Sequence, residues 1–476
     1  MKSARTWCQL GLLSLLAAPL QAQDEADGFN LWPLLTFRPA DTWGRPATST
    51  GLGPFWLGQQ WEDRSVYGFR PLTLSYSWEA RPDDEQFHLA YPIFNYRERG
   101  DMVFWDIYSL IRYRHDSGSD ITDFQAFPFL FYFDSPEPQA NYAAFWPVGG
   151  TLKNFFGRDR VDFAAWPLYV RTRNEKAVRY SVPWPFIQYL KGPESRGWAL
   201  WPLYGHFEKD NDYDRTFALW PIYYDVHRGL DREQPRHDFG VLPFYARSTA
   251  PGLKSETFGW PFFGYTHEWD PRPDYRETRY FWPLFVQGKG EEKFINRWMP
   301  FYTHEGKGLQ EKHWYMWPLV KTSKRWEAPM TIERDQLLYF VWWDERRSTA
   351  TWESRKSYLW PFFGYWDDGE DSRQIQVLDP LGGLFPNKST MRDAWGNLFA
   401  VYRYDRRQES VEHSLLWNLL NWKRNEGETT GLGVGPLFNY QREDERAKGD
   451  WKVLWGLVGR HGSEDDRRWE FFWKDF

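Results

Sequence analysis

The sequence predicts an all-β protein built from an antiparallel repeat of about 20 residues. A short phrase of an aromatic or apolar residue, a proline and one or two apolar residues returns along the chain, as in Trp166-Pro167-Leu168-Tyr169. Between these phrases lie extended segments that are rich in aromatic and β-branched residues and are bounded by charged turns. A proline at the centre of each unit excludes a regular helix, because proline breaks the helical hydrogen-bond pattern.

The spacing of the prolines identifies the phrase as an internal repeat. From Pro147 to Pro318, successive prolines of the phrase stand 17 to 22 residues apart. Units in which the proline is missing keep the same period, and counting them gives about 24 repeats. The signature of the repeat consists of Trp146, Pro147, Trp166, Pro167, Trp184, Pro185, Trp201, Pro202, Trp220, Pro221, Trp260, Pro261, Trp282, Pro283, Trp317, Pro318, Trp360 and Pro361.

The first segment of the chain has the layout of a secretory signal peptide. Lys2 and Arg5 precede an apolar run from Leu10 to Leu20, which is too short to span a bilayer as a helix. A small residue, Ala22, ends the segment, and we expect cleavage after it. The sequence therefore predicts a signal peptide over 1–22.

The remaining residues, 23–476, are predicted to form a single β-repeat domain that works outside the cytoplasm. No linker, charge block or low-complexity tract divides them. The single cysteine, Cys8, lies in the predicted signal peptide, so the mature chain has no disulfide and no thiolate ligand.

The charge balance and the aromatic content limit the kinds of function that the protein can have. The chain has 59 Lys and Arg against 65 Asp and Glu, so it offers no basic surface for nucleic acid. Aromatic residues make up 20% of the chain, including 32 Trp. Such enrichment is typical of a membrane–water boundary, or of a surface that stacks on sugars or apolar ligands.

One strand of ten to thirteen residues per repeat would form an up-and-down transmembrane β-barrel of about 24 strands. The chain ends on a predicted strand that carries Phe472 and Phe476. This ending resembles the last strand of bacterial outer-membrane barrels, where a terminal aromatic residue is recognised by the barrel assembly machinery. Lys474 departs from the expected alternation, so the resemblance is partial. It implies an outer-membrane location, with membrane lipid and the assembly machinery as partners.

Two features oppose a water-filled barrel. A mid-strand proline cannot donate to the sheet ladder. Around Pro221, apolar residues also fill both alternating sets of positions, Trp220 and Ile222 in one set and Leu219 and Tyr223 in the other. The alternative places each aromatic-Pro pair at a corner between two short strands, so that each repeat contributes a hairpin to a soluble propeller, solenoid or spiral sheet.

The sequence predicts no catalytic, cofactor or metal site. Ten histidines are scattered without the spacing of known ligand motifs, and no nucleotide-binding or hydrolase motif occurs. His267 and His304 share one repeat position and precede Glu268 and Glu305, a pattern that duplication explains without a metal. We therefore expect a protein that is not an enzyme and that uses no cofactor.

The expected function is that of an outer-membrane β-barrel protein acting as a channel, a transport conduit or a structural component of the envelope. The alternative is a soluble periplasmic or cell-surface β-repeat that binds a carbohydrate, lipid or protein partner through its aromatic residues. In a barrel, the doubled apolar pattern would favour either a lumen that handles apolar material or a wall that is covered on its inside by another layer.

Overall fold

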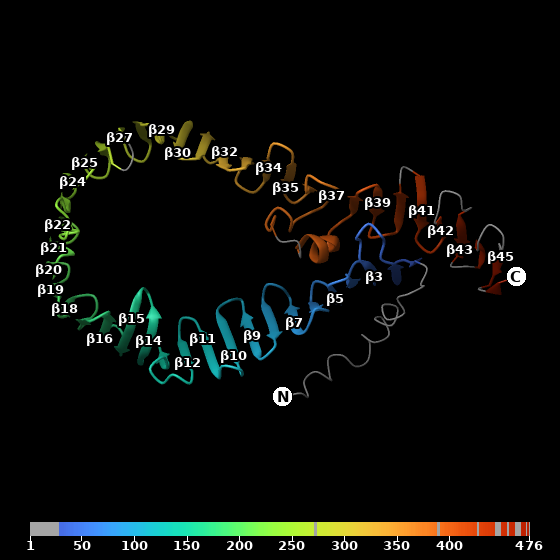
Figure 1. The fold of residues 1–476 in the computed structure, drawn as a ribbon, viewed down its shortest axis with the longest axis horizontal. Coiled ribbons are helices and arrows are strands. Elements are labelled where there is room, and N and C mark those ends of the chain that lie inside the picture. Colours follow the sequence, from blue (N-terminus) through green and yellow to red (C-terminus); the bar gives the residue numbers. More distant parts are fainter. Residues whose placement is uncertain are drawn as a thin grey trace. The chain divides into compact units, whose positions relative to one another are not determined.

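The computed structural model of the protein shows an antiparallel all-β fold (Figure 1), as the sequence predicts. It describes residues 28–270, 274–387, 391–425, 428–442, 449–454, 457–461, 468–472 and 474–475. These residues contain 46 strands in one sheet, together with one short helical insertion. The predicted signal peptide lies outside the described residues.

The chain divides into two compact units. Unit 2 is the continuous segment Asp101–Glu327, and unit 1 combines Met1–Gly100 with Ala328–Phe476. The single domain expected over 23–476 stays a prediction.

The strands of unit 2 follow one another in chain order, each antiparallel to the next. They are β9 Met102–Ile107, β10 Ile111–Asp116, β11 Ile121–Ala126, β12 Leu130–Asp134, β13 Tyr142–Phe145, β14 Gly149–Phe155, β15 Arg158–Ala164, β16 Tyr169–Asn174, β17 Ala177–Ser181, β18 Ile187–Lys191, β19 Ser195–Leu200, β20 Tyr204–Lys209, β21 Tyr213–Ala218, β22 Tyr223–Arg228, β23 Arg236–Val241, β24 Tyr245–Ala250, β25 Leu253–Phe258, β26 Phe263–Glu268, β27 Tyr275–Phe281, β28 Phe285–Lys289, β29 Lys293–Trp298, β30 Tyr302–Lys307, β31 Gln310–Tyr315 and β32 Val320–Glu327.

Unit 1 has an N-terminal and a C-terminal run of strands. The first run is β1 Phe29–Leu31, β2 Leu35–Arg38, β3 Ala47–Gly51, β4 Trp56–Gln60, β5 Arg64–Phe69, β6 Thr73–Trp78, β7 Arg81–Leu89 and β8 Phe94–Arg99. The second run is β33 Met330–Leu337, β34 Trp342–Ser348, β35 Glu353–Leu359, β36 Phe363–Asp367, β37 Ser372–Val377, β38 Tyr402–Arg407, β39 Ser410–Leu415, β40 Leu420–Asn425, β41 Glu428–Val434, β42 Phe438–Gln441, β43 Asp450–Val453, β44 Val458–His461, β45 Arg468–Phe471 and β46 Lys474–Asp475, with a π-helix η1 Met391–Trp395 and a 3₁₀-helix η2 Gly396–Leu398 between β37 and β38.

Each repeat holds two strands rather than one. β21 runs up to the pair Trp220-Pro221 and β22 returns from it, with Ala218 paired to Tyr223. The expected strand number of about 24 is therefore corrected to 46 short strands in the described residues. The physical reason is that the chain reverses at the aromatic-Pro pair, so each predicted strand is two strands joined by a turn. This confirms the alternative prediction that each aromatic-Pro pair lies at a corner between two short strands.

Closure of the sheet is not shown. β1 pairs with β2 and β46 pairs with β45, and in the described residues neither of these terminal strands has a second partner. The closed transmembrane barrel stays a prediction.

The helical insertion of unit 1 covers the N-terminal strands. Ala394 and Trp395 pack in one apolar cluster with Leu57 and Leu74. The buried Arg70 side chain donates a hydrogen bond of 2.6 Å to the Ala394 carbonyl. The insertion thus ties the two halves of unit 1 together, although they are some 300 residues apart in the sequence.

A buried arginine makes a second tie between the same halves. The Arg45 side chain, 2% exposed, donates to the Asp41 carboxylate at 3.0 Å and to the Ser410 hydroxyl at 2.8 Å. It also donates to the Asp405 carbonyl at 2.8 Å and lies 3.4 Å from the Glu412 carboxylate. This network borders a cavity of about 630 Å³ whose lining is rich in charged side chains.

Replacing Arg45 should destabilise unit 1. In Arg45→Ala, the carboxylates of Asp41, Asp405 and Glu412 lose their buried cation, and removal of one member of a buried ion pair costs about 3–5 kcal/mol. We expect a lower urea midpoint in circular dichroism. The matched control is Arg346→Ala, because Arg346 and its partner Glu353 are exposed and exposed pairs contribute about 0–1 kcal/mol. Equal effects of the two substitutions would contradict this account.

The same network should make stability depend on pH. Burial alone would raise the pKa of Asp41, but the charge of Lys423 and the hydrogen bond from the Arg45 backbone lower it to about 2, from an ordinary 3.8. A carboxyl whose pKa is lowered by folding stabilises the protein above its unfolded value and loses that effect as the pH falls through about 2. The stability difference between the unsubstituted chain and Asp41→Asn should therefore be full above pH 4 and shrink towards pH 2. In Lys423→Met the loss should begin at a higher pH, and a difference that does not vary with pH would contradict the assignment.

Candidate functional site

The turns that carry the aromatic-Pro pairs lie along one rim of the sheet. Consecutive antiparallel strands are joined by turns that alternate between the two ends of the strands, and the aromatic-Pro phrases all fall in one of these two sets of turns. We call this the aromatic-Pro rim. The turns at the other strand ends, such as Glu175-Lys176 and Asp210-Asn211-Asp212, form the charged rim.

Each aromatic-Pro turn is closed in the same way. In the turn Ala165 to Leu168, the Leu168 N–H donates to the Ala165 carbonyl at 2.9 Å, and the Trp166–Pro167 peptide bond is cis. This is the pattern of a type VI turn. All nine signature pairs have a cis bond, and all but Trp146-Pro147 show the same closing hydrogen bond. They are Trp146-Pro147, Trp166-Pro167, Trp184-Pro185, Trp201-Pro202, Trp220-Pro221, Trp260-Pro261, Trp282-Pro283, Trp317-Pro318 and Trp360-Pro361.

Neighbouring turns are hydrogen-bonded to each other through the signature residues. The Trp166 N–H donates to the Pro147 carbonyl of the preceding turn at 2.8 Å, and the Trp184 N–H donates to the Pro167 carbonyl at 2.8 Å. The same bond joins Trp220 to Pro202 at 2.7 Å. Proline has no N–H and needs no partner there. The predicted loss of ladder donors at proline therefore does not occur.

As a result, the turn leaves no backbone donor unsatisfied. In the turn 165–168, Ala165 donates to the Val148 carbonyl at 2.7 Å, Trp166 donates to Pro147, and Leu168 closes the turn itself. The turn 219–222 repeats this set of bonds from Leu219, Trp220 and Ile222. A turn whose N–H groups are all hydrogen-bonded can move from water into an apolar environment at a small free-energy cost. The large cost of burying backbone comes from N–H groups without a partner.

The aromatic rings of the signature also meet along the rim. Ring centroids are 5.9 Å apart for Phe129 and Trp146, 5.5 Å for Trp146 and Trp166, and 5.8 Å for Trp166 and Trp184. The structure thus brings three signature tryptophans into one row. The others occupy equivalent turns, where Trp201 contacts Phe186 and Trp360 contacts Phe340.

In most of these turns the residue after the proline is apolar and exposed, while Leu284 after Pro283 is half-buried. Phe244 is 74% exposed and Leu168 is 61% exposed, although neither has a polar group to offer to water. We call these side chains the tip residues. They are Leu34, Ile93, Phe129, Val148, Leu168, Phe186, Leu203, Ile222, Phe244, Phe262, Phe301, Leu319, Phe362 and Leu437, all of them exposed.

The apolar character extends a short way down the strands. Over β20 to β31, the strand residue next to the aromatic-Pro turn is always apolar or aromatic, namely Tyr204, Ala218, Tyr223, Val241, Tyr245, Phe258, Phe263, Phe281, Phe285, Trp298, Tyr302 and Tyr315. The opposite ends of these strands include Lys209, Arg228, Arg236, Glu268, Lys289, Lys293 and Lys307. Counting this strand residue together with the two turn residues beyond it, at about 3.3 Å per residue, the apolar belt is about 10 Å deep.

One turn of the rim has an arginine where others have an aromatic residue. Arg70 precedes Pro71, but its side chain turns inward and is fully buried. Burial lowers its pKa to about 9, and it donates to the carbonyls of Ala394 and Pro54. The charge is therefore kept away from the aromatic-Pro rim.

The C-terminal residues predicted as an assembly signal are only partly described. Phe472 is exposed and lies in the turn after β45, so the predicted final strand from Arg468 is interrupted there. Phe476 lies outside the described residues. Their role in assembly stays a prediction.

The tryptophans and prolines of the rim are predicted from the sequence, but the tip residues are not. The available signal is that the position after proline is always apolar, although turn positions are usually polar. The doubled apolar pattern around Pro221 is also interpreted from the sequence as two apolar faces of a strand. The structure corrects this, because Trp220 and Ile222 lie in a turn.

The chain matches no model of a known protein family, and no curated protein sequence matches it. Among the described residues, no helix is long and apolar enough to cross a membrane.

The row of rings should stabilise the rim. Trp166→Ala removes contacts with Trp146 and Trp184, and aromatic pairs contribute about 0.5–1.5 kcal/mol each beyond burial. We expect about 1–3 kcal/mol of destabilisation in urea unfolding followed by circular dichroism. Leu168→Ala, two residues further on, is the control and should change stability by about 0.5 kcal/mol at most, since the side chain is exposed. A larger effect of Leu168→Ala would show that the tip residues support the fold.

Proposed function

We propose that the protein is a structural component of the cell envelope that is held on the outer membrane by its aromatic-Pro rim. In this proposal the tip residues enter the lipid and the charged rim stays in water. Tryptophan and tyrosine below the tips lie at the boundary, where their amphipathic rings are favoured.

The backbone of the rim carries the proposal. A loop that enters lipid must satisfy its own hydrogen-bond donors, because lipid offers no partner. In the turn 165–168 every N–H is bonded, with Trp166 donating to Pro147 at 2.8 Å. Turns 219–222 and 316–319 bond their donors in the same way. Such a turn combines an apolar tip with no unpaired donor, which is what entry into lipid requires.

The depth of the apolar belt favours insertion into one leaflet. Interfacial segments bury their apolar face about 5–10 Å into the membrane, which agrees with a belt of about 10 Å. A transmembrane barrel needs an apolar band of about 25 Å. A six-residue strand such as β22 is about 20 Å long, and half of its residues, Asp225, His227 and Arg228, are polar. These lengths favour a structural component over a channel whose strands each span the bilayer.

The number of tips makes the attachment strong. Full burial of one large apolar side chain contributes about 1.5–3 kcal/mol, and an exposed tip gains a part of this on entering lipid. Unit 2 alone contributes tips from Phe129 to Leu319. Even at about 1 kcal/mol each, their sum is on the order of 10 kcal/mol, which is the scale of tight binding.

Vesicle binding tests the proposal. The full chain should co-sediment with vesicles of phosphatidylcholine, whose lack of net charge removes electrostatic attraction. The double variant Leu168→Asp/Phe244→Asp should bind about 100-fold more weakly, because each substitution removes about 1.5 kcal/mol of burial or more.

The charged rim offers a matched control. Leu309 and Phe156 are 65% and 81% exposed, as apolar as the two tip residues, but they lie in turns of the opposite rim. Leu309→Asp/Phe156→Asp should bind vesicles within about threefold of the unsubstituted chain. Equal loss in both double variants, or no binding by the unsubstituted chain, would contradict the proposal, and the second result would favour a soluble binding repeat.

A further inference from the structure

The histidines of unit 2 gather on one face of the sheet. In antiparallel strands, alternate residues share a face and directly paired residues lie on the same face. Following the pairing from β20 to β31 places six histidines on a single face, namely His206, His227, His237, His267, His304 and His313. We call it the histidine face.

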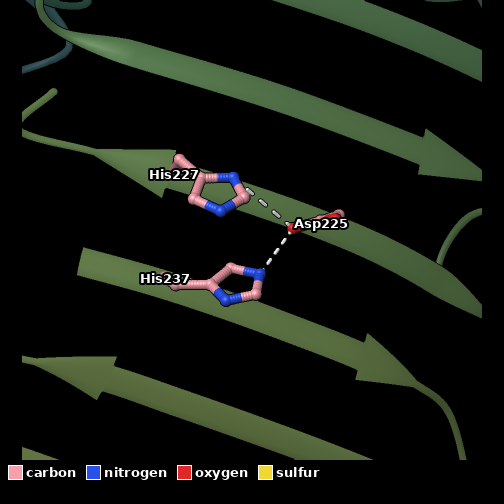
Figure 2. A group of neighbouring side chains, drawn as sticks. All are labelled: Asp225, His227 and His237. Carbon is pink, nitrogen blue, oxygen red and sulfur yellow. Dashed lines mark hydrogen bonds and ion pairs between the residues drawn. The ribbon is translucent and has the colours of Figure 1, made fainter. Parts of the chain in front are cut away.

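Two of these histidines form a cluster with an aspartate on β22 and β23. His227 and His237 are directly opposite each other, with ring centroids 4.1 Å apart and ring planes within 8°. Asp225 lies two residues before His227, and Figure 2 shows both imidazoles turned towards its carboxylate. Asp225 Oδ1 is 2.7 Å from His237 Nε2 and 3.7 Å from His227 Nδ1.

The same arrangement occurs a second time on β30 and β31. His304 and His313 are paired, with ring centroids 3.9 Å apart. Glu311, two residues before His313, has Oε1 at 2.6 Å from His304 Nε2 and 3.2 Å from His313 Nε2. In each cluster the three possible ligand atoms lie within 4.8 Å of one another.

More acidic groups stand beside the first cluster. Asp214 on β21 is paired with His227 on the side away from His237, and Glu208 on β20 is paired with Asp214. Arg196 binds Glu208, and Arg228 and Arg236 belong to the opposite face by alternation. The face around His227 therefore holds more negative than positive charge, which favours a cation.

We propose that Asp225, His227 and His237 bind a divalent transition-metal ion such as Zn²⁺, and that His304, Glu311 and His313 form an equivalent second site. Neutral imidazole is a preferred ligand of zinc, copper and nickel ions, and a carboxylate adds charge to the set. Two histidines and one carboxylate leave further positions for water or for a ligand from solution. The side chains are partly exposed, so an ion can reach them.

The neighbouring repeat shows what a site requires. His267 occupies the same repeat position as His304, but its partner across the ladder is Arg276 rather than a histidine. Arg276 also binds Asp274, the carboxylate nearest to His267. A single imidazole beside a carboxylate that an arginine already binds does not make a metal site, so the shared repeat position alone does not predict one.

Zinc titration of the full chain tests the proposal. After treatment with a chelator, isothermal titration with ZnCl₂ at pH 7.5 should show two tight equivalents. His227→Asn/His237→Asn should remove one of them, and His304→Asn/His313→Asn should remove the other. At pH 5.5 binding should weaken in every form, because protons compete with the metal for imidazole.

A control variant and a further cluster variant distinguish loss of the metal site from loss of the fold. His115→Asn/His267→Asn also removes two strand histidines and should keep both equivalents. If a double variant loses its β-sheet signal in circular dichroism, Asp225→Asn replaces it and should weaken one equivalent about tenfold or more while both rings remain. The proposal is overturned if the unsubstituted chain binds no zinc, if the control loses an equivalent, or if the cluster variants keep both.

Discussion

The backbone hydrogen bond from the tryptophan N–H of one turn to a carbonyl of the preceding turn on the same rim is the interaction on which the repeat depends. It joins Trp166 to the carbonyl of Pro147 and Trp220 to that of Pro202, whereas Trp201 donates to the carbonyl of Phe186. Proline suits this place because it accepts a bond and has no donor to satisfy. Tryptophan suits it because its backbone donates while its ring contacts the next turn, as Trp146 and Trp166 show. One dipeptide therefore closes the turn, sets the register and supplies apolar surface.

This constraint also separates the sheet into two rims of opposite character. Because the aromatic-Pro phrases all fall in one of the two sets of turns, their apolar residues are confined to one set of strand ends, and the charged turns fall at the other set. Because the strands are short, few residues separate the apolar rim from the charged rim. A protein that only needed to be soluble would have no use for exposed residues such as Phe244 at each tip. The proposed attachment to lipid rests on this separation of apolar and charged residues along the strand rather than across its two faces.

The sequence predicts the repeat, its period and its β character, because prolines and aromatic residues mark every unit. It does not decide whether Pro221 lies inside a strand or between two strands, since an apolar run around a turn has the same composition as a strand that is apolar on both faces. After the sheet pairing is known, Ala218 and Tyr223 prove to be partners across a hairpin. The hydrogen bond between Arg45 and Ser410 in unit 1 cannot be predicted from the sequence, because the two residues are 365 positions apart. No local pattern records a contact at that separation.

The histidine clusters show that equivalent positions of a repeat can differ in their chemistry. Duplication places His267 and His304 at one repeat position, yet their chemistry is set by the residue across the ladder, which is Arg276 in one case and His313 in the other. In a β-sheet, the unit of chemistry is the cross-strand pair together with its neighbour two residues along. A sequence signal for such a site is therefore a carboxylate and a histidine two residues apart, with a second histidine at the register position on the next strand. Asp225 and His227 with His237 satisfy this rule, as do Glu311 and His313 with His304, because each set draws its ligands from both strands of one ladder.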